Sequence, residues 1–181
     1  MKEKLFESYP LWMTFVYYLV SLLIYLPGLY LTYLILPVFA ILFFFYIMYL
    51  EIQVLREGCR RCYYYGKRCV CGKGKIAKVF MKKDTKVKFN EKEVTGKSMI
   101  PSMLPPFFAL IAGIYLTYMS WPNFSFIIVG LAIIPLIVTF LGNPILYGKI
   151  ACLHCKQGKL GCPACDFFMK MEKKGEKDKN Y

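Results

Sequence analysis

Charged residues are missing from two long stretches of the sequence. None occurs between Ser8 and Leu50 or between Ser98 and Gly148, which are runs of 43 and 51 residues. Runs of this length exceed what a buried helix of a soluble protein needs. They also leave no intramembrane charge for a proton relay or an ion pathway. We therefore expect neither a soluble enzyme nor an ion-coupled pump or transporter.

The sequence also lacks patterns that would assign a reaction or a removable leader. The first apolar stretch has no small-residue cleavage site and runs straight into a second one, so it is interpreted as a retained helix. The Gly-Lys pairs near the cysteines, such as Gly72-Lys73, do not fit the phosphate-binding loop pattern. The spans hold no acid or base for catalysis. We therefore expect a non-enzymatic role.

Hydrophobic residues make up 57% of the 181 residues, above the roughly 45–50% of soluble domains. A membrane-spanning helix needs about 20 apolar residues, so each uncharged run has room for two spans. We expect the breaks at Pro27-Gly28 and at Trp121-Pro122-Asn123.

The predicted fold is an all-α integral membrane protein with four transmembrane helices in two parallel hairpin repeats. Re-entrant hairpins are the alternative. The predicted spans are Leu11–Leu26, Leu31–Leu50, Pro106–Ser120 and Phe124–Leu141.

Positive charge gathers on the segments between and after the hairpins. Of the 24 Lys and Arg residues, 14 lie in Glu51–Lys97 and 8 follow from Lys149, whereas the hairpin tips carry none. The positive-inside rule then predicts that both termini are cytoplasmic. The predicted parts are a cytoplasmic N-terminus at 1–10, transmembrane hairpins at 11–50 and 105–148, a basic loop with a first cysteine module at 51–104, a second module at 149–172 and a disordered tail at 173–181.

The two halves of the sequence resemble each other at a period of about 93 residues. Three cysteine pairs keep a spacing of 93 residues, and a fourth pair keeps 94. Agreement of this kind is typical of an internal duplication. Each half contains an even number of spans, so both cysteine modules should face the same side. The pairs are Cys59 with Cys152, Cys62 with Cys155, Cys69 with Cys162 and Cys71 with Cys165.

All eight cysteines lie in these two modules, and none lies inside a predicted span. Paired thiolates at short spacing are the ligand set of a closed tetrahedral zinc site. The reducing cytosol disfavours structural disulfides and favours metal or redox chemistry. We therefore predict one zinc ion per module. The predicted ligands are Cys59, Cys62, Cys69 and Cys71 in the first module and Cys152, Cys155, Cys162 and Cys165 in the second.

Other interpretations of the cysteines stay open, and they include other metals and one binuclear site shared by the two modules. Four cysteines also hold iron–sulfur clusters, although this spacing does not match the ferredoxin patterns. Cys-x-x-Cys pairs can also cycle between thiol and disulfide, although no thioredoxin-like pattern surrounds them. His154, the one histidine, lies within the second Cys-x-x-Cys pair, and we expect it to support the site or face solvent rather than bind metal.

The basic residues near the cysteines are expected to contact anionic lipid or another anion, because lysines beside spans attract lipid head groups. Tyr63-Tyr64-Tyr65 could stack nucleic-acid bases, but we expect it to pack at the membrane interface, and we do not expect nucleic acid as a partner. The predicted contact residues are Arg60, Arg61, Lys67, Arg68, Lys73, Lys75, Lys78, Lys82 and Lys83.

Two local elements are predicted in the basic loop. Lys75–Lys83 places Ile76, Val79 and Phe80 on one helical face, which suits a short helix on the membrane surface. Alternation over Thr85–Phe89 predicts a strand followed by a turn.

Taken together, these patterns predict a membrane-anchored platform whose zinc modules dock a cytosolic protein partner or anionic lipid. The alternative is a membrane redox protein that uses iron–sulfur clusters or thiol pairs. Self-association of the chain is compatible with either.

Overall fold

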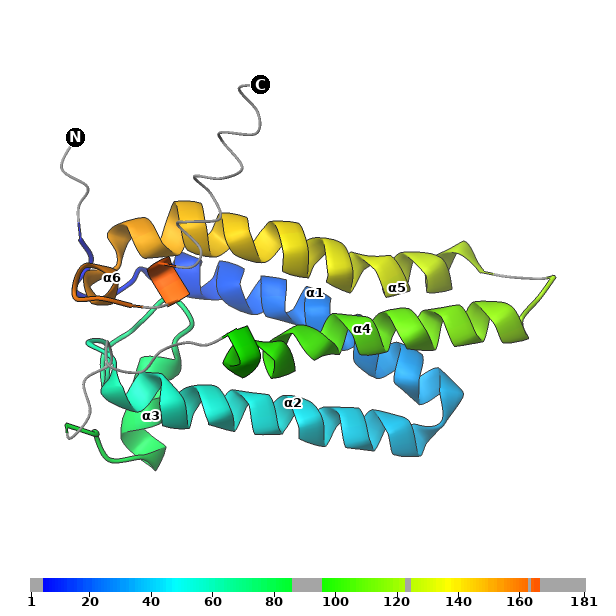
Figure 1. Ribbon diagram of the computed structural model, residues 1–181, viewed down its shortest axis with the longest axis horizontal. Helices are drawn as coiled ribbons and strands as arrows, with labels where there is room; N and C mark the ends of the chain where they lie inside the picture. The colour runs from blue at the N-terminus through cyan, green and yellow to red at the C-terminus, as the bar shows by residue number, and fades with distance from the viewer. Residues whose placement is uncertain (1–4, 86–95, 123–124, 163, 167–181) are drawn as a thin grey trace, which may run out of the picture. The chain divides into compact units, whose positions relative to one another are not determined.

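The computed structural model describes residues 5–85, 96–122, 125–162 and 164–166, with the backbone alone for 96–100. Over these ranges the chain is helical and forms no strand, apart from one isolated bridge between Phe6 and Cys155. This confirms the prediction of an all-helical chain with four candidate membrane spans (Figure 1). The four helices that are long and apolar enough to cross a membrane are Leu11–Ile35, Pro37–Arg61, Pro101–Met119 and Phe126–His154.

The chain divides into two compact units. The first, called here the helical unit, comprises Leu19–Ile52 and Gly96–Gly142. The second, called the cysteine unit, comprises Met1–Tyr18, Gln53–Thr95 and Asn143–Tyr181, and it contains all eight cysteines. The strand predicted over Thr85–Phe89 lies outside the described residues except for Thr85. The tail predicted at 173–181 lies outside them entirely.

The first two spans break at Leu36, and the break predicted at Pro27-Gly28 is wrong. Helix α1 (Leu11–Ile35) continues through Pro27, and α2 (Pro37–Glu57) begins at a proline. Proline suits the first turn of a helix, where its missing N–H has no intrahelical acceptor. Gly28 serves packing instead of a turn, since a Cβ there would lie 2.9 Å from the ring of Phe43 on α2.

The second pair of spans is α4 (Gly96–Met119) and α5 (Phe126–Ile137). Their break falls near Trp121, as predicted, but α4 begins well before the predicted start at Pro106. Pro105 cannot donate the N–H that would normally bond the carbonyl of Pro101. The Tyr46 hydroxyl donates to that carbonyl instead, at 2.7 Å. This side-chain bond satisfies a carbonyl that an apolar surrounding would otherwise leave unpaired.

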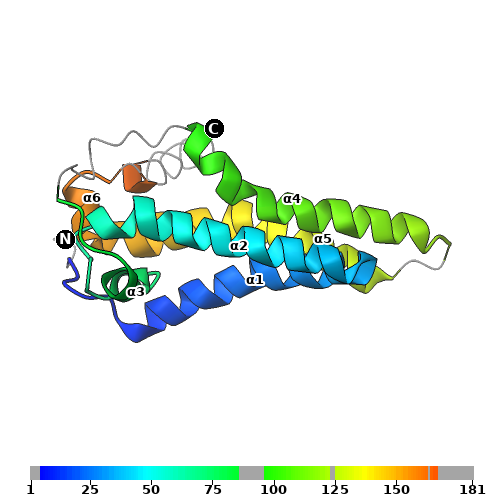
Figure 2. The same cartoon turned by 90° about the horizontal axis from the view of Figure 1, so that it is seen from below.

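Helices α4 and α5 lie side by side in both ribbon views (Figures 1 and 2). Small residues line their contact, where Ala109 and Ala112 of α4 and Ala132 of α5 are buried with Leu31 of α1. Small side chains let helix backbones approach closely, which is the main source of packing energy between helices in lipid. The helical unit therefore has a narrow, alanine-rich core rather than a wide one of large side chains.

After α5 the chain stays helical, but the backbone changes from α-helical to π-helical hydrogen bonding. It passes through two π-helical stretches, η3 (Val138–Gly142) and η4 (Ile145–Ala151). Pro144 lies between them, and it lacks the N–H that a regular α-helix would require at that point. This path leads directly into the second cysteine module at Cys152.

Gly113 should be the least replaceable position of the α4–α5 contact. A Cβ at Gly113 would lie 2.3 Å from the Cβ of Ala132, whereas a Cβ at Gly130 would meet nothing within 4 Å. We expect Gly113→Ala to destabilise the helical unit by about 1–3 kcal/mol through overpacking. Gly130→Ala is the matched control. The check is thermal unfolding in detergent, and equal unfolding midpoints for the two variants would contradict the predicted packing.

Candidate metal centres

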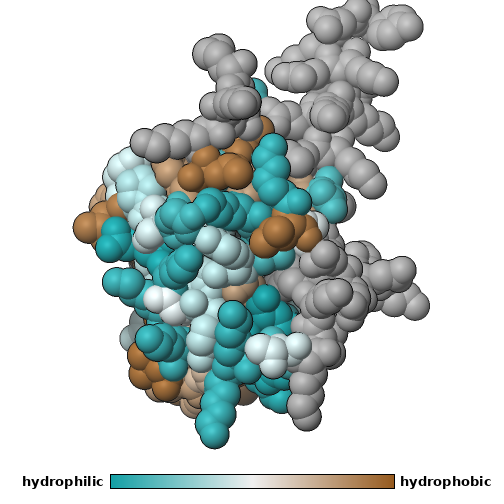
Figure 3. Space-filling model, turned by 90° about the vertical axis from the view of Figure 1, so that its left-hand side faces the viewer, coloured by the Kyte–Doolittle hydropathy of each residue, from teal (hydrophilic) through white to brown (hydrophobic). Residues whose placement is uncertain are grey.

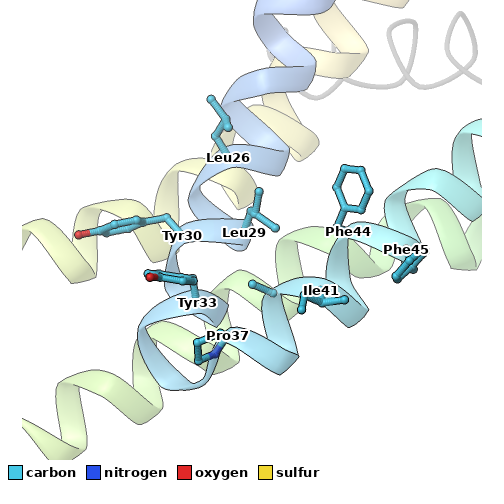
Figure 4. Close-up of a pocket in the computed structure, with 9 residues that line it drawn as sticks. Leu26, Leu29, Tyr30, Tyr33, Pro37, Ile41, Phe44 and Phe45 are labelled. Atoms are coloured by element: carbon cyan, nitrogen blue, oxygen red, sulfur yellow. The ribbon is translucent and has the colours of Figure 1, made fainter.

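An apolar groove in the helical unit does not offer a site for chemistry. The groove has a volume of 720 Å³ and lies between α1 and α2. Its lining is aliphatic and aromatic, and in Figure 4 the hydroxyl ends of Tyr30 and Tyr33 point away from Phe44 and Phe45. Among the described residues, no charged side chain lines this groove to orient a ligand. The groups with chemical reactivity lie instead in the cysteine unit.

Both cysteine modules open on the same local structure. A 3₁₀ turn, η1 (Cys59–Arg61), begins the first module, and another, η5 (Cys152–His154), begins the second. The N–H of Cys62 donates to the carbonyl of Cys59 at 3.3 Å, and the N–H of Cys155 donates to that of Cys152 at 3.2 Å. Each turn brings the first two cysteines of its module to one side of the chain.

In the first module the sulfurs of Cys69 and Cys71 lie 3.4 Å apart. The pKa of Cys69 falls to about 6, chiefly because the Cys71 thiol donates to it, and the Gly74 N–H at 3.3 Å adds to the effect. The same bond raises the pKa of Cys71, together with burial. Burial raises the pKa of Cys62 to about 12. The module therefore combines a stabilised thiolate with buried thiols.

The second module gathers its four sulfurs around one residue. The thiol of Cys165 lies within hydrogen-bonding reach of the sulfurs of Cys152, Cys155 and Cys162, which raises the pKa of Cys165. The Cys165 thiol lowers the pKa of Cys155 to about 6, and backbone N–H groups of Gly158 and Gln157 also donate to that sulfur. The pKa of Cys162 falls for the same reason. This module is a cluster of three buried cysteines, with the half-buried Cys155 packed against them.

Two glycines allow the backbone to pass close to these sulfurs. A Cβ at Gly74 would lie 2.2 Å from the carbonyl oxygen of Tyr64 and 2.5 Å from that of Lys67. A Cβ at Gly158 would lie 3.3 Å from the sulfur of Cys165. Any larger residue at Gly74 would push two backbone segments apart, so glycine is required there.

The N-terminal segment joins the two modules. The Tyr64 hydroxyl donates to the carbonyl of Phe6 at 2.7 Å and accepts the N–H of Lys156 at 3.1 Å. The Tyr9 hydroxyl donates to the carbonyl of Ala151 at 2.7 Å, and it also contacts the Cys155 sulfur. Tyr64 is only 1% exposed and forms a buried core with Tyr9, Met13, Val70 and Ala151. These bonds make the two modules one packed body.

Further polar contacts join the same segments at the surface. The Tyr63 N–H donates to the Gln157 side chain at 2.7 Å, which joins module one to module two directly. Glu7 accepts from the Tyr63 hydroxyl at 2.6 Å and pairs with Lys67 at 3.4 Å and with Lys156. Because Glu7 is well exposed, its ion pairs should add little stability.

The predicted basic contact residues separate into two groups. Arg60 and Arg61 both pair with Asp84 at 2.8 Å, and Lys73 is only 6% exposed, with its amine over the Tyr17 ring. These three are therefore engaged within the protein, and their contact with lipid or another anion stays a prediction. Arg68 is half-buried and donates to the carbonyl of Tyr9. The exposed predicted residues are Lys67, Lys75, Lys78, Lys82 and Lys83.

Sequence reasoning missed the residues that join the modules. His154 stacks on Phe6 with ring centroids 4.9 Å apart, in line with a supporting role. Tyr64 is buried in the core of the cysteine unit, where its hydroxyl has two partners. No motif marked Tyr9 or Gln157, since their partners are far away in the sequence. The run of three tyrosines was the one available signal.

Each module offers four thiols, which is the donor set of a closed metal site. Within the described ranges, no three or more histidine, cysteine or acidic side chains are arranged as a metal site. The sulfurs of Cys69 and Cys71 lie within hydrogen-bonding distance of each other. No family model matches this chain, and no curated protein or solved structure matches it. The functional interpretation therefore rests on the chemistry of the cysteine unit itself.

Replacing Tyr64 by phenylalanine should loosen the junction between the modules. Tyr64→Phe leaves the Phe6 carbonyl and the Lys156 N–H without their partner, at a cost of about 1–3 kcal/mol. We expect faster hydrogen exchange at the Lys156 amide. Tyr65→Phe is the control, because it loses a bond to the Met81 carbonyl within the first half. Equal Lys156 protection in both variants would show that Tyr64 does not hold the junction.

Proposed function

We propose that this protein is a multi-pass membrane protein whose two cysteine modules each bind one zinc ion on the cytoplasmic side. Together the modules form a rigid basic platform that docks a cytosolic protein partner or anionic lipid. The observation that carries the proposal is the gathering of Cys152, Cys155 and Cys162 around Cys165. Three of these four thiols are buried, and buried thiols in one cluster are costly to charge unless a cation neutralises them.

The sulfur spacing in the first module suits a tetrahedral thiolate site. Zinc–sulfur bonds of about 2.3 Å in a tetrahedron place sulfurs about 3.8 Å apart. The 3.4 Å between Cys69 and Cys71 is close to that separation. A zinc ion would displace the shared protons, and the backbone N–H groups on Cys69 and Cys155 would support the thiolates.

Several features support two equivalent modules that arose by duplication. The cysteines repeat at 93 or 94 residues, and both modules open on a 3₁₀ turn closed by the same backbone hydrogen bond. The pKa is lowered at the paired cysteines Cys69 and Cys162 and raised at the paired cysteines Cys71 and Cys165, because in each case a neighbouring thiol shares a hydrogen bond. Each module is preceded by a candidate span, Pro37–Arg61 or Phe126–His154. If the two spans cross the membrane in the same direction, the modules at their ends lie on the same side of the membrane.

A docking role is supported by the rigidity and the charge of the cysteine unit. The bonds of Tyr64 and Tyr9 hold both modules and the N-terminal segment together. The face drawn in Figure 3 is largely hydrophilic, with a few hydrophobic patches. The net charge of +13 makes an anionic surface or an acidic protein the favoured partner.

Thiol redox chemistry is the second candidate function, and one observation favours it. A pKa of about 6 makes Cys69 and Cys155 thiolates at neutral pH, and each has a neighbouring thiol within reach. A thiolate beside a second thiol is the arrangement that forms and breaks disulfides.

Metal content separates the two candidates. Protein purified anaerobically in detergent should be colourless and contain about two zinc ions per chain. Cys59→Ser and Cys155→Ser should each remove about one ion, because neither module has a spare thiol. His154→Ala should retain both ions, since its ring stacks on Phe6. The measurement is elemental analysis of metals with acid-labile sulfide and a visible spectrum.

Other outcomes of that measurement assign other functions. Iron with sulfide and visible absorbance would identify an electron carrier and overturn the zinc proposal. A metal-free protein would support the thiol redox candidate. Unchanged zinc in both cysteine variants would rule out two four-thiolate sites.

The orientation of the protein is tested separately. Positive charge on the loop and the tail predicts that the C-terminus is cytoplasmic. A fluorescent protein fused after Tyr181 should fluoresce, and an alkaline phosphatase fused after Ser120 should be active outside the cytoplasm. The opposite pattern of reporter activity would place the cysteine modules on the other side and exclude a cytosolic partner.

A further inference from the structure

Helix α3 (Lys73–Phe80) packs on the first cysteine module by one face. The buried residues of that face are Lys73, Gly74 and Ala77. Gly72 precedes the helix with a φ of +68°, and a Cβ there would also meet Thr14 at 3.1 Å. The N–H of Gly66 donates to the carbonyl of Gly74 at 2.8 Å. The orientation of α3 is therefore set by the module, and the helix does not swing freely.

A second face of α3, beside the buried one, is apolar and exposed to solvent. Val79 and Phe80 are 78% and 75% exposed, and Ile76 is 38% exposed. Residues three and four apart lie on one face of a helix, so these three side chains form a single patch. We call Ile76, Val79 and Phe80 the α3 patch. Exposed aromatic and branched side chains in one cluster mark an interaction surface.

Positive charge surrounds the α3 patch. Lys75 and Lys78 are exposed on the helix, and Lys82 and Lys83 are exposed just after it. No acidic residue occurs between Gly72 and Lys83. The next acid, Asp84, is paired with Arg60 and Arg61. The surface therefore combines an apolar centre with lysines that no acid of the same segment neutralises.

An anionic bilayer surface is the occupant that fits this combination. Interfacial helices bury an apolar face at the headgroup boundary while their lysines bind anionic lipids. Only one cysteine module separates α3 from the candidate span Pro37–Arg61, so the helix is tethered near any membrane that this span crosses. A second copy of the chain would bring the same lysines face to face, at an electrostatic cost.

We propose that α3 is an interfacial anchor that inserts the α3 patch into the headgroup region of an anionic leaflet. This inference rests on the proposed function, and it names the lipid surface as the occupant of one part of the platform. The first cysteine module then acts as the support that presents α3 to the bilayer. Lys82 and Lys83 hold anionic head groups beside the patch.

The test places one tryptophan reporter on α3 in the full-length protein. The native residues Trp12 and Trp121 are replaced by phenylalanine, and Phe80→Trp supplies the reporter. The protein is reconstituted in nanodiscs of phosphatidylcholine, with or without phosphatidylserine, whose acyl chains are brominated to quench tryptophan. Ile127→Trp in the same background is the positive control, because Ile127 lies on an exposed face of the candidate span α5.

We expect the emission of the Phe80→Trp reporter to shift to shorter wavelength and to be quenched when phosphatidylserine is present. Lys82→Gln and Lys83→Gln should each weaken insertion about fivefold, as expected for one lysine at an anionic surface. The contrary result is an α3 reporter that emits like a water-exposed indole in both kinds of nanodisc while the Ile127→Trp control is quenched. This result would overturn the proposal. The patch would then be assigned to a protein partner.

Zinc content measured on the same samples separates the two proposals. About two zinc ions with an unquenched α3 reporter would overturn the lipid anchor alone. A quenched α3 reporter in a protein without zinc would support the anchor and overturn the zinc platform. Both results together thus assign any failure to one proposal.

Discussion

The Tyr64 hydroxyl joins three segments that are far apart in the sequence. It bonds the carbonyl of Phe6 and the N–H of Lys156 from a position inside the first cysteine module. A buried hydroxyl without partners would be costly, so the surrounding backbone must close around it. As a consequence, the two modules pack with the N-terminal segment as one body. The rigidity of the proposed platform depends on this packing.

The core that surrounds Tyr64 is small. Its buried members are Tyr9, Met13, Tyr64, Val70 and Ala151, and the cysteines extend it on both sides. Small folds with little buried apolar area usually need metals or disulfides for stability. Gly74 has no side chain, so the backbone can fold tightly around the cysteine sulfurs of this small core.

The helical unit is subject to a different constraint. Its helices contain several prolines, each of which removes a backbone donor. The Tyr46 hydroxyl supplies one missing bond to Pro101, and the Thr32 hydroxyl bonds the carbonyls of Gly28 and Leu29 within α1. In an apolar surrounding such side-chain bonds replace those that water would make. The hydroxyls of Tyr46 and Thr32 thus bond backbone carbonyls of this unit.

Local patterns in the sequence were enough to predict the four apolar helices, the two cysteine modules and the amphipathic face of α3. Charge-free runs, cysteine spacing and helical periodicity can each be recognised without knowledge of a partner. The turn at Leu36, the burial of Lys73 and the pairing of Arg60 and Arg61 with Asp84 depend instead on how the chain packs. The same holds for Tyr64, through which the N-terminal segment joins both modules. These features depend on which distant groups meet in space, and hydrogen-bond partners chosen by packing leave no periodic signal in the chain.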